Sequence, residues 1–528
     1  MKDIKHLALL VPAVAAPSIV PAHAGQTSPG RPNIIHIMSD DHAYQAISAY
    51  GDPLSQGAPT PNIDRLASEG MLFRRAYVEN SLSTPARACL MTGLYSHQNG
   101  QRTLGKGIDS TKTFVSEIFR DNGYQTAVVG KWHMQCEPKG FDYYRVFSGQ
   151  GEYYNPRVKS HDSDGKYLRQ EGYATELVTD MALEFLENRD TTRPFILFVH
   201  HKAPHRNWLP ALKYLELYEG ETFPMPATIN DDYSSRGDAA RDQHMSILRD
   251  MTMEYDLKVF DASEKYAGER HRDQLARALD RLTDSEKQMV MDSYNERNAD
   301  IATADLSEEQ LLLWKYQRYV KDYLRVIHSV DESVGELLAY LEEKGLLDNT
   351  VVTYCSDQGF YMGEHGWFDK RFMYEESFRT PLLIRYPSVI KPGVESRAMV
   401  QNIDFAPTYL DLAGIKAPEE MVGRSMVPVL KHNGRAPLRW RRYLYYHYYD
   451  TPSEHSVWRH DGVFDKRYKL IHFYDEKGQK ASYDELYDLR KDPSELNNII
   501  ADKKYGRVLK RLYRVLDRFR SQQGVDEW

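Results

Sequence analysis

The sequence has few cysteines, and their spacing excludes a fold held together by disulfides. The chain has 528 residues and 3 cysteines, Cys89, Cys136 and Cys355. An odd number at such wide spacing offers neither a disulfide framework nor a cysteine-based metal cluster. We interpret all three as mostly buried free thiols. A chain of this length can bury a large core without covalent crosslinks.

An excess of positive charge and a long apolar run are also absent. The formal net charge is −8, so a nucleic-acid partner has no electrostatic support. A mildly acidic enzyme can still hold an anionic substrate if its positive groups gather in one cleft. No stretch beyond the N-terminus is apolar enough to span a bilayer, so we expect no membrane span.

The first 24 residues resemble a secretory signal. Lys2 and Lys5 precede the apolar run Leu7–Val14, and residues 22–24 (Ala-His-Ala) form a small-x-small cleavage site. The alternative is a disordered N-terminus without a targeting role. We predict a signal peptide at 1–24, a catalytic domain at 25–435 and a C-terminal subdomain at 436–528. After cleavage near Ala24 the protein is expected to be periplasmic or secreted.

Short β-branched runs alternate with helical stretches from about residue 31 onward, which predicts an α/β fold with a mostly parallel sheet. Candidate strands are Asn33–Met38, Gln125–Val129, Phe195–Val199 and Val351–Tyr354. Apolar residues at helical spacing predict a helix over Tyr316–Lys344. The charged segment 214–312 is interpreted as a helical insertion. Short aromatic runs at 444–449, 462–464, 468–473 and 485–489 predict a small antiparallel sheet, followed by a helix near 505–522.

Polar residues follow each of the four candidate strands at once. They are Ser39-Asp40-Asp41, Gly130-Lys131-Trp132-His133, His200-His201-Lys202-Ala203-Pro204-His205 and Ser356-Asp357-Gln358-Gly359. Because ligands bind beyond the carboxyl ends of strands in open α/β sheets, we expect these groups to meet in one site.

The acidic residues at two of these ends favour a hard cation. Asp40, Asp41, Asp357 and Gln358 offer the oxygen ligands that Ca²⁺ accepts, whereas zinc more often recruits histidine or cysteine. An acidic pair at a single strand end would more simply cap a helix or face solvent. The second strand end makes a metal site the better interpretation.

The segment Ser83-Thr84-Pro85-Ala86-Arg87 predicts the start of a helix. Thr84 is a good N-cap, Pro85 suits the first helical position, and the helix should end near Gly93. Ser83 would then lie at a helix N-terminus, where free N–H groups favour an anion. Taken by itself, a serine there is an ordinary capping residue.

This segment, continued by Leu90-Met91-Thr92-Gly93, resembles the signature of type I sulfatases, in which the first position, Cys or Ser, becomes formylglycine. Further matches in the same order are Asp40-Asp41, 60–67, 130–133, 203–205, 356–359, 363–366, 485–489 and Asp492-Pro493. The resemblance covers about residues 31–500. It implies an alkaline-phosphatase-like α/β fold: a large mixed, mostly parallel sheet flanked by helices, with a smaller C-terminal antiparallel sheet plus helix.

The resemblance also implies how the sulfate is attacked. The formylglycine hydrate derived from Ser83 would be the nucleophile and would ligate Ca²⁺ together with Asp40, Asp41, Asp357 and Gln358. Serine instead of cysteine at position 83 implies a radical SAM maturase as a partner. Gln358 stands where many family members carry Asn or His, and its amide oxygen can still ligate calcium.

Five further residues receive catalytic roles from the resemblance. Arg87 and Lys131 would stabilise the hydrate and the developing charge. His133 would be the base, while His205 and Lys370 would bind sulfate oxygens and protonate the departing sugar oxygen. The alternatives are surface positions for the two lysines and structural roles for the histidines.

The segment 359–377 is similar to bacterial N-acetylglucosamine-6-O-sulfatases that act on heparan or mucin glycans. His365, Asp369 and Arg371 are candidates for binding the sugar, and His455 for closing one side of the pocket, although a folded sheet corner explains His455 equally well. We expect exo-acting removal of 6-O-sulfate from N-acetylglucosamine in a sulfated glycan. The alternatives are a sulfatase for another sugar, a phosphate or phosphonate monoester hydrolase with two transition metal ions, and an inactive glycan-binding protein.

Overall fold

The computed structural model describes residues 30–260, 271–299, 301, 304–474 and 481–525. The predicted signal segment 1–24 lies outside the described residues. The chain from Arg31 onward forms a single compact unit. Among the described helices, none has the length and apolar character needed to cross a membrane. All three cysteines are free, and Cys89 and Cys355 are buried, as predicted.

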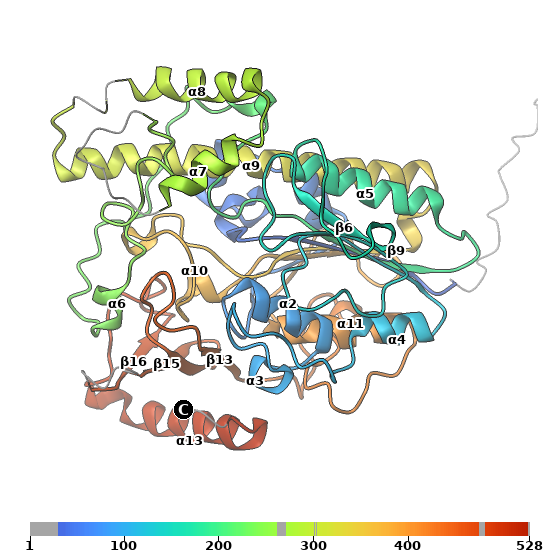
Figure 1. The fold of residues 1–528 in the computed structure, drawn as a ribbon. Helices are drawn as coiled ribbons and strands as arrows, with labels where there is room; N and C mark the ends of the chain where they lie inside the picture. Colours follow the sequence, from blue (N-terminus) through green and yellow to red (C-terminus); the bar gives the residue numbers. More distant parts are fainter. Residues whose placement is uncertain (1–29, 261–270, 300, 302–303, 475–480, 526–528) are drawn as a thin grey trace, which may run out of the picture. The chain divides into compact units, whose positions relative to one another are not determined.

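A ten-stranded sheet lies at the centre of the described fold, with its strands in the order β11-β2-β10-β9-β1-β8-β4-β5-β6-β7 (Figure 1). The strands are β1 (Asn33–Ser39), β2 (Met71–Phe73), β4 (Gln125–Gly130), β5 (Tyr143–Phe147), β6 (Arg157–Ser160), β7 (Leu168–Arg169), β8 (Phe195–His200), β9 (Thr350–Ser356), β10 (Leu382–Arg385) and β11 (Val394–Ser396). The run from β9 to β5 is parallel, whereas β10 and β6 are antiparallel to their neighbours. This confirms the predicted mixed, mostly parallel sheet. A separate pair joins β3 (Ala76–Tyr77) to β12 (Val400–Gln401).

The four predicted strands correspond to β1, β4, β8 and β9, and each reaches one or two residues further toward its carboxyl end than predicted. Every residue in these four strands is buried. Strands covered on both faces show continuous apolar runs, which is why the sequence revealed them.

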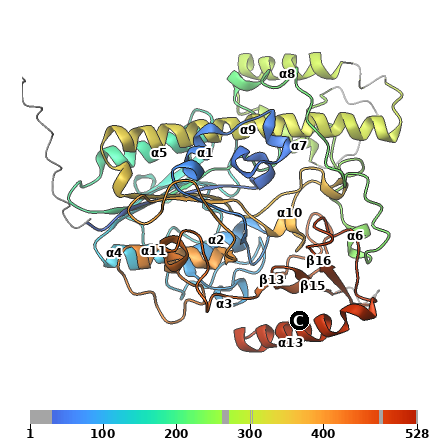
Figure 2. The ribbon, with the colours of Figure 1, turned by 180° about the vertical axis from the view of Figure 1, so that it is seen from behind.

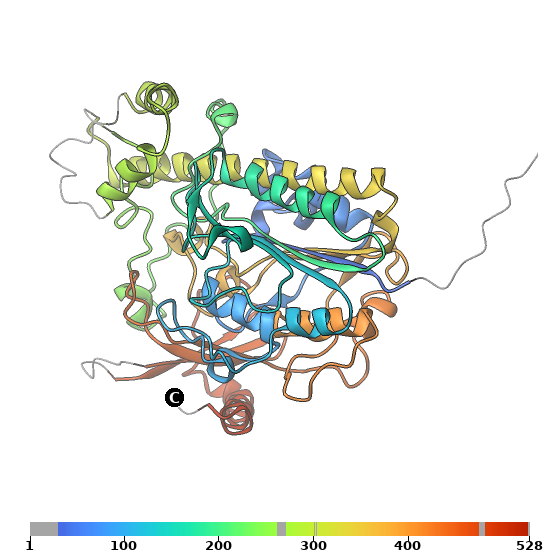
Figure 3. The ribbon, with the colours of Figure 1, turned by 45° about the vertical axis from the view of Figure 1, so that its right-hand side comes forward.

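Helices cover both faces of the sheet: α5 and α9 lie on one face, and α2, α4 and α11 on the other (Figures 1 and 3). The helices are α1 (Pro61–Ser68), α2 (Ser83–Thr92), α3 (Ser96–Asn99), α4 (Val115–Asp121), α5 (Ala174–Asn188), α6 (Ala239–Asp242), α7 (Arg272–Leu279), α8 (Asp284–Asn298), α9 (Glu308–Glu343), α10 (Glu375–Phe378), α11 (Phe405–Leu412), α12 (Val427–Lys431) and α13 (Gly506–Gln523). The described part of the predicted insertion contains α6, α7 and α8.

Helix α9 begins eight residues before the predicted start at Tyr316. The Ser307 side chain accepts a hydrogen bond from the Gln310 backbone N–H, and the Gln310 side chain bonds back to Ser307. This capping box starts the helix in a polar stretch, where an apolar pattern gives no signal.

The C-terminal part forms the predicted antiparallel sheet, with α13 packed against it (Figure 2). Its strands are β13 (Leu444–Tyr448), β14 (His460–Phe464), β15 (Tyr468–Phe473) and β16 (Tyr483–Asp488), in that order. Leu512 and Leu516 of α13 are buried with Leu470 of β15 and Leu486 of β16.

Candidate active site

The carboxyl ends of four parallel strands meet at one edge of the sheet because their registers are aligned. Ser39 of β1 pairs with Ser356 of β9, while Met38 of β1 and Gly130 of β4 both pair with His200 of β8. Gly130 has a φ of 90°, and a Cβ there would lie 2.0 Å from the His200 carbonyl oxygen. This close approach requires glycine, and it brings the segment after β4 beside the segment after β8.

Helix α2 presents Ser83 to the same edge. The helix begins at Ser83, with the extended residue Leu82 as its N-cap, so the prediction of Thr84 as the cap was wrong. It ends as predicted at Gly93, which adopts the left-handed conformation. All of α2 is buried, and Ser83 Oγ donates a hydrogen bond of 2.8 Å to Asp40 Oδ1.

The predicted acidic residues form one buried cluster. The Asp41 backbone N–H donates to Asp357 Oδ1 at 3.1 Å, and Gln358 Nε2 donates to Asp41 Oδ1. Asp40, Asp41, Asp357 and Gln358 are each at most 1% exposed. Four oxygen-bearing side chains from two adjacent strand ends therefore converge next to Ser83.

The pKa values of the three carboxylates are not all shifted in the same direction. Burial raises the pKa of Asp357 to about 7, and the charge of Asp40 acts in the same direction. Burial also raises the pKa of Asp41 to about 6, although Lys370 opposes it. For Asp40, burial is outweighed by nearby positive charges, chiefly those of Lys131 and Arg87, which hold its pKa well below the usual value.

Two cations from different elements support this cluster on one side. Arg87 of α2 is fully buried and donates to the Lys131 carbonyl oxygen at 2.9 Å and to Asp357 Oδ2 at 3.0 Å. Lys131 Nζ donates to Asp40 Oδ2 and to Gln150 Oε1. Burial lowers the pKa of Lys131, and the charge of Asp40 partly compensates.

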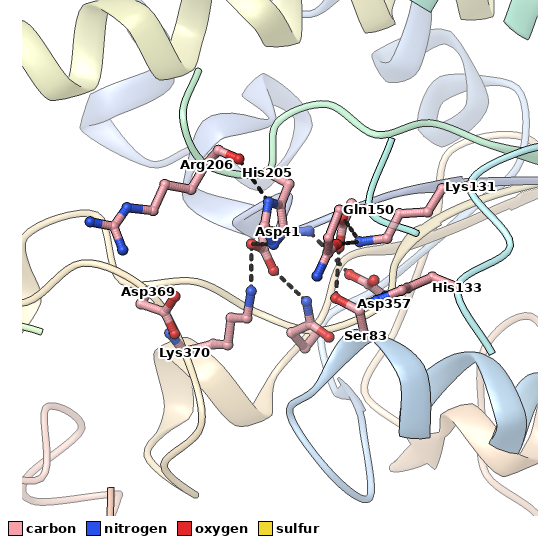
Figure 4. Close-up of polar contacts among 12 residues, drawn as sticks. Asp41, Ser83, Lys131, His133, Gln150, His205, Arg206, Asp357, Asp369 and Lys370 are labelled. Carbon is pink, nitrogen blue, oxygen red and sulfur yellow. Dashed lines mark hydrogen bonds and ion pairs between the residues drawn. The ribbon is translucent and has the colours of Figure 1, made fainter. Parts of the chain in front are cut away.

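A second group of donors faces Asp41. Lys370 Nζ donates to Asp41 Oδ2 at 2.6 Å, and His205 Nε2 lies 3.8 Å from the same oxygen. Burial alone would lower the pKa of Lys370, but Asp41 and Asp369 outweigh it and raise that pKa. In Figure 4, Lys370 and Lys131 lie on opposite sides of Asp41.

The two predicted catalytic histidines are neutral near pH 7. Burial lowers the pKa of His133 well below its usual value, and the charge of Lys131 adds to this. Burial likewise lowers the pKa of His205. His205 Nδ1 lies 2.8 Å from the Arg206 carbonyl oxygen and donates to it, which leaves Nε2 facing the carboxylates.

Three of the four predicted sugar-binding residues form a compact group next to Lys370. Asp369 Oδ1 accepts hydrogen bonds from the Lys370 backbone N–H at 2.7 Å and from Arg371 Nε at 3.0 Å. His455 Nε2 lies 3.3 Å from Asp369 Oδ2. Asp369 and Arg371 have positive φ values of 77° and 96°. Such backbone conformations in non-glycine residues gather at functional sites.

The structure does not bring His365 to this group. His365 is fully buried, and its Nδ1 lies 2.8 Å from both Asp231 Oδ2 and Arg236 NH2. Through these contacts with Asp231 and Arg236, His365 connects the segment 359–377 to the insertion. A contact between His365 and a sugar stays a prediction.

A pocket of about 760 Å³ opens beside the cluster and includes two residues that the prediction missed, Gln150 and Lys202. Burial lowers the pKa of Lys202 to about 8, and the charge of Lys131 acts in the same direction. Gln150 follows β5 in a loop between two glycines, and no pattern in that loop marks it. Lys202 lies in the polar run after β8, among residues of similar character.

The donor set fits a hard divalent cation. Gln358 Oε1 is buried and has no hydrogen-bond partner among the described residues. Ligand atoms of Asp40, Asp41 and His205 lie within 4.8 Å of one another. A cation that accepts oxygen ligands would be coordinated by the buried carboxylates and by the unpaired amide oxygen. His205 is the only nitrogen donor in this described group.

Comparisons with known families agree with this geometry. Residues 32–415 match the family model described as "Sulfatase", and residues 363–522 match that described as "N-sulphoglucosamine sulphohydrolase, C-terminal". The first match covers more than half of the chain. It includes β1, α2, β4, β8 and β9, the elements that position the cluster.

Individual relatives extend the match to nearly the whole chain. An N-acetylglucosamine-6-O-sulfatase from Bacteroides thetaiotaomicron is 46% identical over 97% of this chain and 90% of its own length. An N-acetylglucosamine-6-sulfatase from Capra hircus is 25% identical over 89% of this chain and 80% of its length. A solved structure in complex with its substrate D-glucosamine-2-N,6-O-disulfate superposes with a TM-score of 0.89 at 45% identity, covering 94% of this chain and 99% of that one. The buried serine-carboxylate cluster and these matches together show that the chain belongs to the sulfatase family.

Proposed function

We propose that the protein hydrolyses the 6-O-sulfate ester of N-acetylglucosamine at the end of a sulfated glycan chain. The nearly full-length similarity to a bacterial N-acetylglucosamine-6-O-sulfatase supports the sugar and the position of the sulfate. The similar solved structure carries a 6-O-sulfated glucosamine as its substrate, which supports the same choice.

The observation that carries the reaction type is the environment of Ser83. Its hydroxyl lies at the N-terminus of a buried helix, 2.8 Å from Asp40. Lys131 also donates to Asp40, and Arg87 to Asp357. A plain serine hydroxyl is a weak nucleophile. Oxidation of Ser83 to the aldehyde, with loss of two hydrogens, would provide the hydrated nucleophile that the family uses.

The surrounding residues divide the proton transfers between them. His133 is neutral near pH 7 because burial lowers its pKa, so it can accept a proton from the hydrate. Lys370 stays protonated because Asp41 and Asp369 raise its pKa. It can therefore donate a hydrogen bond to sulfate and a proton to the departing sugar oxygen. His205 Nε2 lies on the same side of Asp41.

Calcium is the metal we propose for the acidic cluster. Asp40, Asp41, Asp357, Gln358 and the hydrated residue 83 would hold it through oxygen atoms. When bound, the ion would polarise the sulfate and favour the deprotonated nucleophile. Arg87 would keep Asp357 in place through its 3.0 Å hydrogen bond.

The charge of the pocket favours heparan sulfate-type glycans over mucin-type glycans. Its positive lining residues are Arg157, Arg169, Lys202, Arg206, Arg277 and Arg281, against the carboxylates of Glu152, Asp280 and Glu454. A chain that carries further sulfate or carboxylate groups would find partners there. Glu454 accepts from Arg206 at 3.2 Å and lies 2.7 Å from His271 Nε2, so loops from three regions meet at the pocket. This enclosure supports exo action on a chain end.

Export and maturation complete the proposal. The N-terminal segment supports cleavage near Ala24 and a periplasmic or secreted location. Serine at position 83 supports conversion by a radical SAM maturase before the protein reaches that location.

The proposal is tested by peptide mass spectrometry of position 83 in protein from its native host, together with assays of sulfate release. We expect a loss of two hydrogens at Ser83 and release of sulfate from 6-O-sulfated N-acetylglucosamine. Conversion without release would overturn the sugar and direct the assays to galactose, N-acetylgalactosamine and uronate sulfates. Unmodified serine in calcium-loaded native protein would overturn the sulfatase reaction and leave a glycan-binding protein.

A further inference from the structure

A second cavity, of about 410 Å³, has an arginine-rich lining that the proposed reaction does not use. Its lining residues are Tyr44, Tyr50, Gly51, Asp52, Pro53, Arg74, Arg75, Arg379 and Arg397. It shares no lining residue with the active-site pocket. Four guanidinium groups face one carboxylate among these residues, in a protein whose net charge is −8.

Backbone hydrogen bonds gather the four arginines from three segments. Arg74 and Arg75 join β2 to β3, Arg379 follows α10, and Arg397 joins β11 to β12. The Arg74 N–H donates to the Ser396 carbonyl at 2.8 Å, and the Thr380 N–H donates to the Ala76 carbonyl at 3.0 Å. The cavity is therefore built on paired strands rather than on independent loops.

One of the four arginines, Arg74, is fully engaged by hydrogen bonds to neighbouring residues. Arg74 makes hydrogen bonds of 3.0 Å and 2.6 Å to the Glu395 carboxylate and one of 2.8 Å to the Tyr50 carbonyl oxygen. This bidentate pair uses its guanidinium, and it holds Arg74 against the ring of Tyr50.

The other three arginines have donors to spare. No hydrogen bond or ion pair in the described part of the chain engages the side chains of Arg75, Arg379 or Arg397. Arg379 Nε is buried without a hydrogen-bond partner there. Its guanidinium lies 3.9 Å from the centre of the Tyr44 ring, which fixes its orientation. A buried donor without a partner is unfavourable, and an anion in the cavity would satisfy it.

Asp52 adds a feature that a site for a bare anion would not need. Its Oδ1 accepts a hydrogen bond from the Leu54 N–H at 3.0 Å, which orients the carboxylate at the start of η3 (Pro53–Gln56). A carboxylate repels an anion but accepts hydrogen bonds from hydroxyl groups. Guanidinium groups beside a carboxylate therefore match a ligand that carries both an anionic group and hydroxyl groups.

We propose that this cavity binds a sulfate group carried on a sugar. Arg75, Arg379 and Arg397 would hold the sulfate oxygens, and Asp52 would accept a hydrogen bond from a sugar hydroxyl. The site would hold a second part of a sulfated glycan away from the reaction centre. The proposal rests on the proposed function in taking the bound sugar to be sulfated.

Calorimetric titration with a 6-O-sulfated N-acetylglucosamine disaccharide tests this site. The Ser83→Ala protein prevents turnover, and the two cavities share no lining residue. We expect two binding events per chain. Adding Arg75→Gln and Arg397→Gln should weaken one event about tenfold or more, because two charge-assisted hydrogen bonds are lost. A second variant, Arg379→Gln, should weaken the same event.

The matched control removes two exposed arginines elsewhere, by Arg435→Gln and Arg439→Gln, and should keep both events. Two full events in the Arg75→Gln, Arg397→Gln protein, or a single event in the parent, would refute the site. Equal binding of the unsulfated disaccharide would refute the role of sulfate. If inorganic sulfate at the same concentration displaced the disaccharide, a contribution of the sugar to binding would be refuted. Failure of the proposed reaction would appear separately, as absent sulfate release by the mature enzyme.

Discussion

The surroundings of two lysines in the buried cluster shift their pKa values in opposite directions. Burial lowers the pKa of Lys131, whereas the charges of Asp41 and Asp369 overcome burial and raise the pKa of Lys370. Only the second change guarantees a proton at neutral pH. Lys370 is therefore the candidate that carries a proton for the sugar oxygen, although its raised pKa makes it a weaker acid, and Lys131 is the candidate for stabilising charge beside Asp40.

This assignment predicts a dependence on the leaving group. Lys370→Gln should lower kcat for the sugar sulfate about 10²- to 10⁴-fold, which is the usual contribution of general acid catalysis. With a nitrophenyl sulfate, whose leaving group needs no proton, the loss should be much smaller. Steady-state kinetics on both substrates checks this. An equal loss on both would show that Lys370 serves sulfate binding alone.

Lys202 predicts a pH effect on substrate binding. Burial lowers its pKa to about 8, so the cation is present below that pH and is lost above it. Its attraction for an anionic glycan should weaken as the pH rises through about 8, and KM should rise. The profile of kcat/KM against pH measures this. Lys202→Arg should remove the alkaline rise in KM, and Lys202→Gln should show a high KM at every pH.

The chemistry-bearing residues could be predicted from the sequence where a motif or a strand end marked them. Asp40, Asp357 and Lys131 follow buried strands directly, so their meeting is a consequence of register. Gln150 lies in a loop whose path depends on packing, and nothing local marks it. For His365, a polar motif alone does not distinguish a sugar ligand from a buried partner of Asp231.

At the scale of elements, prediction succeeded where burial imposed a pattern. The central parallel strands are buried throughout and mostly apolar because helices cover both of their faces. The outer strands β6 and β7 have only four and two residues, with exposed positions. Such short strands at or next to the sheet edge are defined by pairing with their neighbours, which a local pattern does not reveal. The start of α2 was misplaced by two residues because Leu82 provides no side-chain cap.

The insertion is held to the catalytic core by a buried lysine. Lys258 is fully buried, and its Nζ donates to the carbonyl oxygens of Asn207, Trp208 and Asp256 and to Asp322 Oδ2 of α9. These bonds connect the insertion both to α9 and to the loop that follows His205. An effect on this loop would therefore reach the reaction centre.

Lys258→Met should lower the free energy of unfolding by about 3–5 kcal/mol, because the partners of a buried ion pair lose their hydrogen bonds. Sulfate release should fall as well, since the loop beyond His205 loses its support. Denaturant titration and kinetics on one preparation measure both effects. The control is Lys344→Met, which breaks an exposed pair with Glu187 and should change neither. Unchanged stability in Lys258→Met would contradict the proposed role of Lys258 in connecting the insertion to the core.

At the scale of the whole molecule, the charged cluster exists only in the folded chain. Asp40, Asp41 and Asp357 come from two strands that form the middle of the sheet. Lys131, Arg87 and Lys370 reach the same cluster from three other segments, so the charges meet only when the fold is complete. A metal ion that binds this arrangement and not the unfolded chain must stabilise the native state.

Removal of calcium should therefore lower the Tm. At a calcium concentration about 100 times its Kd, binding adds about 2.7 kcal/mol to the free energy of unfolding. Chelation should reverse the gain, and added calcium should restore it. Asp357→Asn should weaken the calcium dependence, whereas Asp348→Asn, at a carboxylate 88% exposed, should leave it intact.

Metal analysis should give one calcium per chain. Two zinc or manganese ions would instead indicate a phosphate or phosphonate monoester hydrolase, and a Tm unaffected by chelation in calcium-loaded protein would contradict a cation site in the cluster.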